Sequence, residues 1–282
     1  MAEHSTARAA KAAAASGNRL VGPIAVLVAM CGLTAALPAA AGPVADRVHS
    51  SGELRVCIWP DYYGITWRNP RNKQLVGIDI DLSAEFARDL GARLVYVESS
   101  FPQLIGDLQS DRCDISMHAV GITPQRQAAL RFSQPYLRSD IYGVTTRSSQ
   151  MVRSWEDIDR PGVKVAVQGG TFMEPVMKES LKQATLVSIQ PPQTREQELE
   201  AGRVDVFMTD YPYSRRLLDN ADWARLVAPP KPFHQVPYAY AVKPGDDDWL
   251  RTVDAFVARI QHDGRLQRAA DKYGLGEIVV KP

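Results

Sequence analysis

Short apolar runs alternate with amphipathic stretches along most of the chain. Residues 54–58, 94–99 and 114–119 are rich in β-branched and other apolar side chains, which is typical of buried strands. Helical periodicity separates them, over residues 81–92 and 103–110. Strands and helices that alternate in this way predict parallel βαβ units, which bind ligands at the carboxyl ends of their strands.

The same alternation starts again at residue 163. Three further strands are predicted at 163–167, 185–189 and 204–210, with helical stretches between them. The chain then closes with a strand at 238–244 and two amphipathic helices within residues 246–274. The second half therefore repeats the pattern of the first and adds a C-terminal tail.

Two ten-residue segments match each other closely. Residues 108–117 and 199–208 share Leu, Arg, Asp and Met at the same spacing. We interpret this match as an internal repeat of two α/β lobes, although helix–strand junctions also resemble one another by composition alone.

Two lobes in tandem would leave the residues after 233 without a lobe. We therefore predict that the chain crosses to a second lobe near residues 136–144 and returns near 234–242. The predicted divisions are 46–137 for the first part of lobe 1, 138–233 for lobe 2, and 234–282 for the return crossing and the C-terminal helices of lobe 1. The expected fold is α/β, with two Rossmann-like lobes joined by a two-strand hinge above a cleft.

The N-terminal segment differs in kind from the rest. Three basic residues, Arg8, Lys11 and Arg19, precede an apolar run over 20–37, which three alanines at 39–41 follow. This order predicts a cleavable secretory signal peptide over residues 1–41. A retained membrane anchor, or a lipid anchor at Cys31, are the alternatives.

The charge left after cleavage is nearly balanced. Residues 1–41 hold three of the 33 Lys and Arg and one of the 32 Asp and Glu, which leaves 30 and 31 and a net charge of −1. A chain with no basic excess is not expected to bind nucleic acid or an anionic membrane surface.

Two cysteines, Cys57 and Cys113, follow the predicted signal peptide. Cys57 falls late in one predicted strand, and Cys113 comes just before the start of another. If these strands are parallel neighbours, their Cα atoms are too far apart for a bridge. We therefore predict two free thiols.

Residues 123–126 begin a helix in an unusual way. Thr123 is a good N-cap and Pro124 suits the first helical position, but Arg126 adds a cation at the positive end of the helix dipole. Either Arg126 turns into water or pairs with a carboxylate, or it joins the free N–H groups in a site for an anion.

Further candidates for a binding site follow the predicted strands. An N–H cradle at Gly170 and Thr171 would suit an anion, whereas the carboxylate of Asp210 would suit a cation, so that together they fit the two ends of a zwitterion. A tight turn and a helix cap are the structural alternatives. The complete set of predicted ligand-binding residues is Arg126, Asp210, Gly170, Thr171, Ala119, Gly121 and His118, with Tyr63 and Phe101 as the aromatic wall.

Sequence motifs of enzymes are scarce. The chain contains no nucleophile elbow, P-loop, zinc-protease motif or clustered Cys and His. We therefore predict a binding protein that is not an enzyme and that uses no metal and no cofactor.

Four segments, 75–92, 114–137, 163–174 and 202–210, resemble signature blocks of the family-3 periplasmic solute-binding proteins. The T-P-x-R and F-S-x-P-Y motifs within 123–136 are the most specific part. This resemblance implies a type II periplasmic binding protein fold. It also implies a periplasmic monomer that captures an amino acid, or a related small carboxylate, for an inner-membrane ABC permease.

The resemblance also assigns roles to single residues. In the family, the arginine that matches Arg126 binds the ligand's α-carboxylate, helped by N–H groups at the position of Gly170 and Thr171. The acid that matches Asp210 binds the α-ammonium. Two departures are Gly121, where the family often has a hydroxyl, and His118, where a small residue is usual.

Two other functions on the same frame stay open. Periplasmic cyclohexadienyl (arogenate or prephenate) dehydratases resemble the chain at residues 159–163 and 169–171. Their catalytic glutamate would align with Met173, one place before Glu174. A ligand-binding partner of a membrane sensor would use the same pocket.

Overall fold

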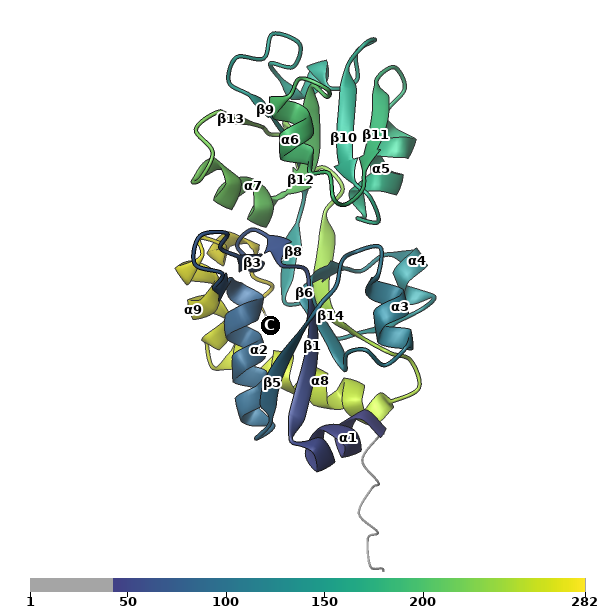
Figure 1. Ribbon diagram of the computed structural model, residues 1–282, viewed down its shortest axis with the longest axis vertical. Coiled ribbons are helices and arrows are strands. Elements are labelled where there is room, and N and C mark those ends of the chain that lie inside the picture. Colours follow the sequence, from purple (N-terminus) through teal and green to yellow (C-terminus); the bar gives the residue numbers. More distant parts are fainter. Residues whose placement is uncertain (1–42, 282) are drawn as a thin grey trace, which may run out of the picture. The chain divides into compact units, whose positions relative to one another are not determined.

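The computed structural model describes residues 43–281 (Figure 1). The predicted signal peptide at 1–41, including Cys31, lies outside the described residues. None of the helices described has both the length and the apolar character that a membrane crossing requires.

The first large sheet has the strand order β5-β1-β6-β14-β7, and β8 also pairs with β14. Its strands are β1 (Glu53–Ile58), β5 (Arg93–Glu98), β6 (Ile115–Gly121), β7 (Arg131–Phe132), β8 (Leu137–Ser139) and β14 (Val236–Val242). We call this sheet and the helices packed on it lobe 1. These helices are α1 (Pro43–Ser51), α2 (Ile78–Asp89), α3 (Leu104–Gln109), α4 (Pro124–Gln127), α8 (Asp247–His262) and α9 (Arg265–Lys272).

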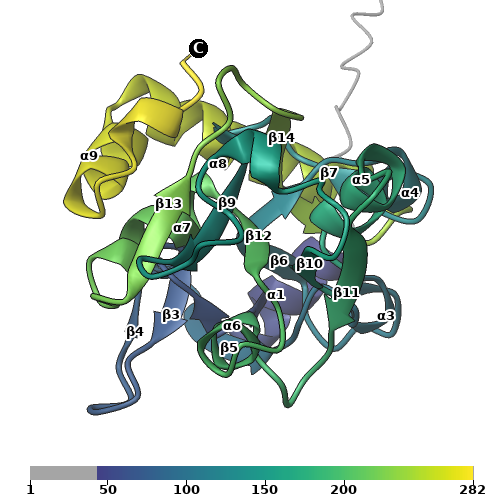
Figure 2. The same cartoon turned by 90° about the horizontal axis from the view of Figure 1, so that it is seen from above.

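The second sheet, in lobe 2, has the order β11-β10-β12-β9-β13, which runs across Figure 2. Its strands are β9 (Ile141–Thr146), β10 (Lys164–Gln168), β11 (Thr185–Ile189), β12 (Val206–Asp210) and β13 (Ala224–Val227). The helices of lobe 2 are α5 (Met173–Ser180), α6 (Arg195–Glu200) and α7 (Tyr211–Leu218), and a 3₁₀ turn spans Trp155–Asp157. A small sheet of β2 (Asp61–Tyr62), β3 (Thr66–Arg68) and β4 (Leu75–Val76) follows β1, and a second 3₁₀ turn, Gly276–Ile278, follows α9.

The strand directions confirm the predicted fold class. In lobe 1, β1 runs parallel to both β5 and β6, and in lobe 2, β10 runs parallel to both β11 and β12. One antiparallel strand is added to each parallel set, β14 beside β6 and β9 beside β12. The chain is therefore an α/β protein with two lobes of related topology.

Two crossings connect the lobes. The first lies between β8 and β9, and the second lies between β13 and β14. The predicted division at 137–138 falls within β8, and the one at 233–234 falls between β13 and β14. After the second crossing the C-terminal helices pack on lobe 1, where Trp249 of α8 donates its indole N–H to the Asp114 carbonyl at 2.9 Å.

The two cysteines form a disulfide, so the prediction of free thiols is wrong. Cys57 and Cys113 have Cα atoms 5.6 Å apart. Strand pairing brings Cys57 opposite Ser116, but Cys113 lies in the turn before β6 and does not follow the strand register. This turn places it against Cys57 beside Leu104 and Leu108 of α3. Spacing along parallel strands was therefore the wrong constraint for Cys113.

Candidate functional site

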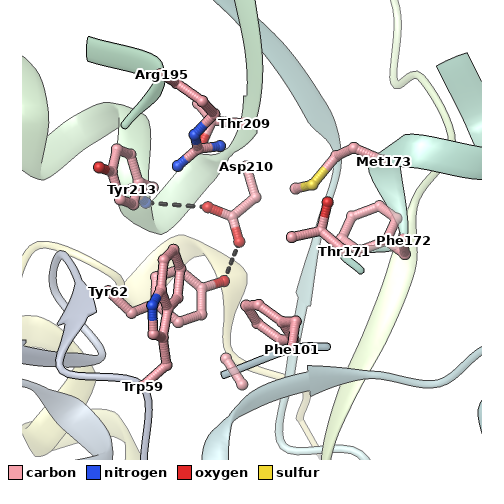
Figure 3. Close-up of a pocket in the computed structure, with 11 residues that line it drawn as sticks. Trp59, Tyr62, Phe101, Thr171, Phe172, Met173, Arg195, Thr209, Asp210 and Tyr213 are labelled. Atoms are coloured by element: carbon pink, nitrogen blue, oxygen red, sulfur yellow. Dashed lines mark hydrogen bonds between the residues drawn. The ribbon is translucent and has the colours of Figure 1, made fainter. Parts of the chain in front are cut away.

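A pocket lies where the ends of β6 and β12 face each other across the lobes. The pocket is narrow, because only about 20 Å³ is open to the centre of a water-sized molecule. Lobe 1 contributes Trp59, Tyr62, Phe101 and Ala119, and lobe 2 contributes Thr171, Phe172, Met173, Arg195, Thr209, Asp210 and Tyr213 (Figure 3). The carboxyl ends of parallel strands therefore form the site, as the topology requires.

Arg126 lies beside this pocket as a buried cation. Thr123 caps α4 by accepting the Arg126 N–H at 3.2 Å, and the helix is only four residues long. The Cζ atom of Arg126 lies 5.1 Å from the centroid of the Phe101 ring, and only 6% of Arg126 is exposed. Nη1 donates to the Gly121 carbonyl at 2.9 Å, and Nη2 donates across the lobes to the Gly170 carbonyl at 3.1 Å.

The environment of Arg126 is unusual for a charged group. Burial lowers the pKa of its guanidinium to about 10. Within residues 43–281, no carboxylate forms an ion pair with it, so it neither turns into water nor pairs with an acid. Two neutral carbonyls stabilise a buried charge less than a carboxylate does, so the described groups compensate the charge of Arg126 only in part.

Asp210 supplies the pocket's carboxyl group. Its Oδ1 caps α7 by accepting the Tyr213 N–H at 3.1 Å. Its Oδ2 accepts two phenols of lobe 1, that of Tyr238 at 2.6 Å and that of Tyr62. Figure 3 shows the contacts of Asp210 with Tyr62 and Tyr213. Burial raises the pKa of this carboxyl. A carboxylate has about four lone-pair positions, so one is left for a ligand.

The turn at Gly170 and Thr171 uses its own polar groups. The Gly170 N–H donates to Glu174 Oε2 at 2.9 Å, and the Thr171 hydroxyl and N–H both donate to the Gln168 carbonyl. Gly170 has φ +75°, and a Cβ there would lie 2.8 Å from Pro102 of lobe 1. Glycine therefore permits the close approach of the lobes, whereas the expected N–H cradle is occupied within the turn.

Ala119 is held in a strained conformation at the pocket. Its φ is +49°, and its N–H donates to Asp79 at 2.9 Å. The same carboxyl accepts the phenols of Tyr136 and Tyr240 at 2.5 and 3.1 Å. Burial raises the pKa of Asp79 to about 7. Asp79 is a positioning residue that sequence reasoning missed, although an acid amid the apolar residues of 75–82 is a recognisable pattern.

His118 lies behind the pocket wall and does not line the pocket. It is fully buried, and burial lowers its pKa to about 4, so the ring is neutral. Nδ1 lies 2.9 Å from the Ser116 hydroxyl and 3.3 Å from the Cys57 carbonyl. The ring packs edge-on against Phe101 at 5.1 Å and supports that part of the wall.

The space around Gly121 explains one departure from the family. A Cβ at this position would lie 3.1 Å from Val236 and 3.3 Å from Phe172. A hydroxyl side chain would crowd both neighbours, so the backbone carbonyl toward Arg126 is the polar group that this residue offers.

Two of the predicted site residues have different relations to the pocket. Phe101 lines it, whereas Tyr63 packs against Trp67 and Tyr213 outside it, with both ring centroids at 5.0 Å. Tyr62 takes the place expected of Tyr63, because only one of two adjacent side chains can face the cleft.

Arg195 is a pocket residue that the sequence did not reveal. It follows the cap Thr194 at the start of α6, and the charged sequence there, TREQELE, is typical of a solvated helix. In the structure the residue is 3% exposed. Its guanidinium lies over the Tyr213 ring at 4.6 Å, and Nη1 donates to the Met208 carbonyl at 2.9 Å.

Within residues 43–281, no three His, Cys, Asp or Glu side chains stand close enough to hold a metal ion. The chemistry available to the pocket is therefore that of two guanidiniums, one carboxyl, phenols and an aromatic wall.

Comparisons with known proteins place this geometry in context. Residues 54–276 match the bacterial extracellular solute-binding proteins, family 3. The ancestral amino acid-binding protein AncCDT-1, described as a precursor of cyclohexadienyl dehydratase, superposes with a TM-score of 0.74 at 30% identity, covering 81% of this chain and 98% of that one. A binding component of an ABC transporter from Wolinella succinogenes, complexed with lysine, has a TM-score of 0.70 at 26% identity, over 78% and 95% of the two chains.

One relative corrects a prediction. Cyclohexadienyl dehydratase of Pseudomonas aeruginosa is 32% identical over 229 residues, which cover 81% of this chain and 85% of the dehydratase. The prediction that the protein is not an enzyme is therefore overturned, because the lack of familiar catalytic motifs does not exclude catalysis on this frame. The match over residues 54–276, the two lobes and the pocket between them together show that the chain belongs to the family 3 bacterial extracellular solute-binding proteins.

Proposed function

We infer that the pocket binds an amino acid or a related small carboxylate in the periplasm and that the protein delivers it to an ABC permease. The observation that carries this inference is Arg126, a buried guanidinium that no carboxylate neutralises within the described residues. A ligand carboxylate would supply the missing negative charge. Its ammonium would take the remaining acceptor position of Asp210.

Closure of the lobes would accompany binding. Side-chain hydrogen bonds already join lobe 1 to lobe 2, from Arg126 to the Gly170 carbonyl and from Tyr62 and Tyr238 to Asp210. A ligand held by Arg126 and Asp210 would strengthen this closed arrangement, because both lobes would contact it at once. Closure also removes water from the pocket, which strengthens each ionic contact.

The comparisons support this function in general terms. A lysine complex and an ancestral amino acid-binding protein share the fold at 26% and 30% identity. The predicted signal peptide and the family's extracellular location support a periplasmic site of action.

A thermal-shift screen tests the proposal. The purified protein, freed of carried-over ligand by unfolding and dialysis, is heated with each amino acid and with small mono- and dicarboxylates. A ligand at about a hundred times its Kd adds roughly 2.7 kcal/mol, which should raise Tm by about 5–10 °C. A shift from one compound, or from a few related ones, is expected. No shift from any of them would contradict the proposal.

The 32% identical dehydratase supports a second candidate function, the dehydration of a cyclohexadienyl acid. Met173 lines the pocket, and Glu174 is engaged by the Gly170 N–H, so among the pocket-lining residues described Asp210 is the one carboxyl group. Its raised pKa suits a proton donor to the departing hydroxyl, which leaves as water while the ring carboxylate leaves as CO₂. Release of phenylpyruvate from prephenate by the wild type, and its loss in Asp210→Asn, would establish this activity. No release would refute it.

A further inference from the structure

We propose that Arg195 is a second anion-binding residue and that the pocket prefers amino acids that carry a second carboxylate. The inference rests on the proposed function and names its ligand class. It starts from Arg195, a buried guanidinium that has fewer hydrogen-bond partners than a buried charge usually has.

Arg195 is a buried cation with an incomplete set of partners. Among the described residues, its only hydrogen bond runs from Nη1 to the Met208 carbonyl. Its Nε is buried without a partner, and it forms no ion pair there. Most buried polar groups find a partner, and most buried charges are paired. A guanidinium that lines a pocket and has donors to spare is therefore a candidate for ligand contact.

Within the described residues, neither carboxyl group nearby forms an ion pair with Arg195. Asp210 lies close enough to Arg195 for their charges to interact, but it accepts two phenols and a backbone N–H. Glu196, the next residue, accepts the Tyr213 phenol at 2.7 Å. Figure 3 shows the Arg195 guanidinium on the same side of the pocket as Asp210 and Tyr213.

The count of charges selects the ligand. The site contains two buried guanidiniums, Arg126 and Arg195, and one carboxyl, Asp210. A zwitterion with an uncharged side chain adds one charge of each sign and leaves one guanidinium in excess. An amino acid with a second carboxylate has a net charge of −1 and removes that excess, whereas a basic amino acid adds to it.

The wall between the two arginines is aromatic. Phe101 lies against Arg126, and Tyr213 lies against Arg195. Trp59 stands between these rings, at 5.3 Å from Phe101 and 6.5 Å from Tyr213. Such a wall suits an apolar chain or ring that joins the two anionic groups.

The fold itself does not require arginine at this place. The internal repeat aligns Leu108 with Leu199, and the same spacing aligns Leu104, the first residue of α3, with Arg195, the first residue of α6. Leu104 is buried in lobe 1. An apolar side chain therefore serves the scaffold at the equivalent position, which favours a ligand-directed role for the arginine.

Calorimetric titration of the ligand-stripped protein tests the proposal with matched probes. L-Glutamate and L-glutamine differ by one negative charge, and so do L-aspartate and L-asparagine. The wild type is expected to bind the dicarboxylate of at least one pair about 10- to 100-fold more tightly, which is the usual value of a charged hydrogen bond. Arg195→Gln should bring this ratio close to one, and Arg195→Lys should retain part of it.

The control is Arg215→Gln, which removes the same charge from an exposed residue on α7. It should leave the ratio unchanged. A wild type that binds monocarboxylates as tightly as dicarboxylates would overturn the proposal, and so would a ratio that survives in a folded Arg195→Gln. In both results the proposed function stands. If no amino acid or carboxylate binds the wild type at all, the proposed function fails, and the proposal fails with it. If a variant does not fold, the ratio of dicarboxylate to monocarboxylate affinity in the wild type still tests the proposal.

Discussion

The two lobes share a scaffold down to single hydrogen bonds. At the start of β6, Asp114 accepts the Arg55 N–H at 2.7 Å and donates its own N–H to the Arg55 carbonyl at 2.9 Å. At the start of β12, Asp205 makes the same pair of contacts with Lys164, at 2.8 and 3.0 Å. The repeated Leu, Arg, Asp and Met of the sequence thus mark one junction built twice.

The lobes differ where the equivalent elements reach the pocket. Asp210 ends β12, and the equivalent residue in β6 is Ala119, while Leu104 and Arg195 begin equivalent helices. At both pairs of equivalent positions lobe 1 has an apolar side chain and lobe 2 has a charged one. The charged residue that lobe 1 contributes beside the pocket is Arg126, which comes from α4.

A second parallel concerns two buried carboxyls. Asp79 and Asp210 each accept two phenols and one backbone N–H. Asp210 lines the pocket, whereas Asp79 lies behind Ala119 and fixes its backbone. The same arrangement of two phenols and one N–H therefore surrounds a carboxyl that lines the pocket, Asp210, and a carboxyl that positions the pocket wall, Asp79.

The largest expected effect comes from breaking the shared junction on one side. Asp114 also pairs with Arg47 and Arg55, whereas the Asp205 carboxylate accepts only the Lys164 N–H among the described contacts. Asp114→Ala should lower the free energy of unfolding by about 3–5 kcal/mol, because it leaves two arginines unpaired. Asp205→Ala should cost about 1 kcal/mol. Denaturant titration measures both, and equal losses would contradict this asymmetry.

The next effect is a pH dependence from Asp79. Burial raises its pKa from 3.8 in the unfolded chain to about 7, so between these values the folded chain binds more protons. The free energy of unfolding should therefore fall as pH rises from about 4 to 7, by about 1.4 kcal/mol per unit and up to about 4 kcal/mol. Asp79→Asn lacks this contribution. A wild-type minus Asp79→Asn difference that does not change with pH would refute the assignment.

The disulfide belongs to lobe 1, since lobe 2 contains no cysteine. Replacing Cys57 and Cys113 together by Ala should lower the free energy of unfolding by about 2–4 kcal/mol, because the unfolded chain loses a constraint. Denaturant titration under non-reducing conditions measures the loss. Two reactive thiols in the denatured, unreduced wild type would show that the bond does not form.

A smaller effect on stability is expected from copying lobe 1 into lobe 2. Arg195→Leu introduces the side chain that the equivalent Leu104 already provides. The loss should be about 1.5 kcal/mol, the low end for a hydrogen bond from a charged group, here the one to the Met208 carbonyl. A loss above about 3 kcal/mol would mean that the arginine holds lobe 2 together, contrary to its proposed role.

Much of the fold could be predicted from the sequence, because strand and helix periodicity and the repeat are local patterns. Thr123 and Pro124 predict a helix start, and the structure has one there, although α4 is only one turn long. The pairing of Cys57 with Cys113 was missed because it depends on how a turn folds back over a strand. Periodicity says nothing about such a turn.

The candidate site was harder to predict than the fold. Arg126 and Asp210 stand at a helix start and a strand end, which are recognisable positions, and the structure brings both to the cleft. Tyr62 and Tyr63 are adjacent, so the sequence could not tell which of them faces the pocket. Arg195 is hidden because a charged helix start is usually solvated, and only tertiary packing buries it.

The central claim is that the charge of Arg126 is neutralised by a ligand carboxylate. Calorimetric titration of ligand-stripped wild type and Arg126→Ala, with the carboxylate that gives the largest thermal shift, tests it most directly. We predict one site per chain in the wild type and an affinity at least about a hundredfold lower in the variant, because the carboxylate loses its charged partner. Equal affinity in the two proteins would contradict the account.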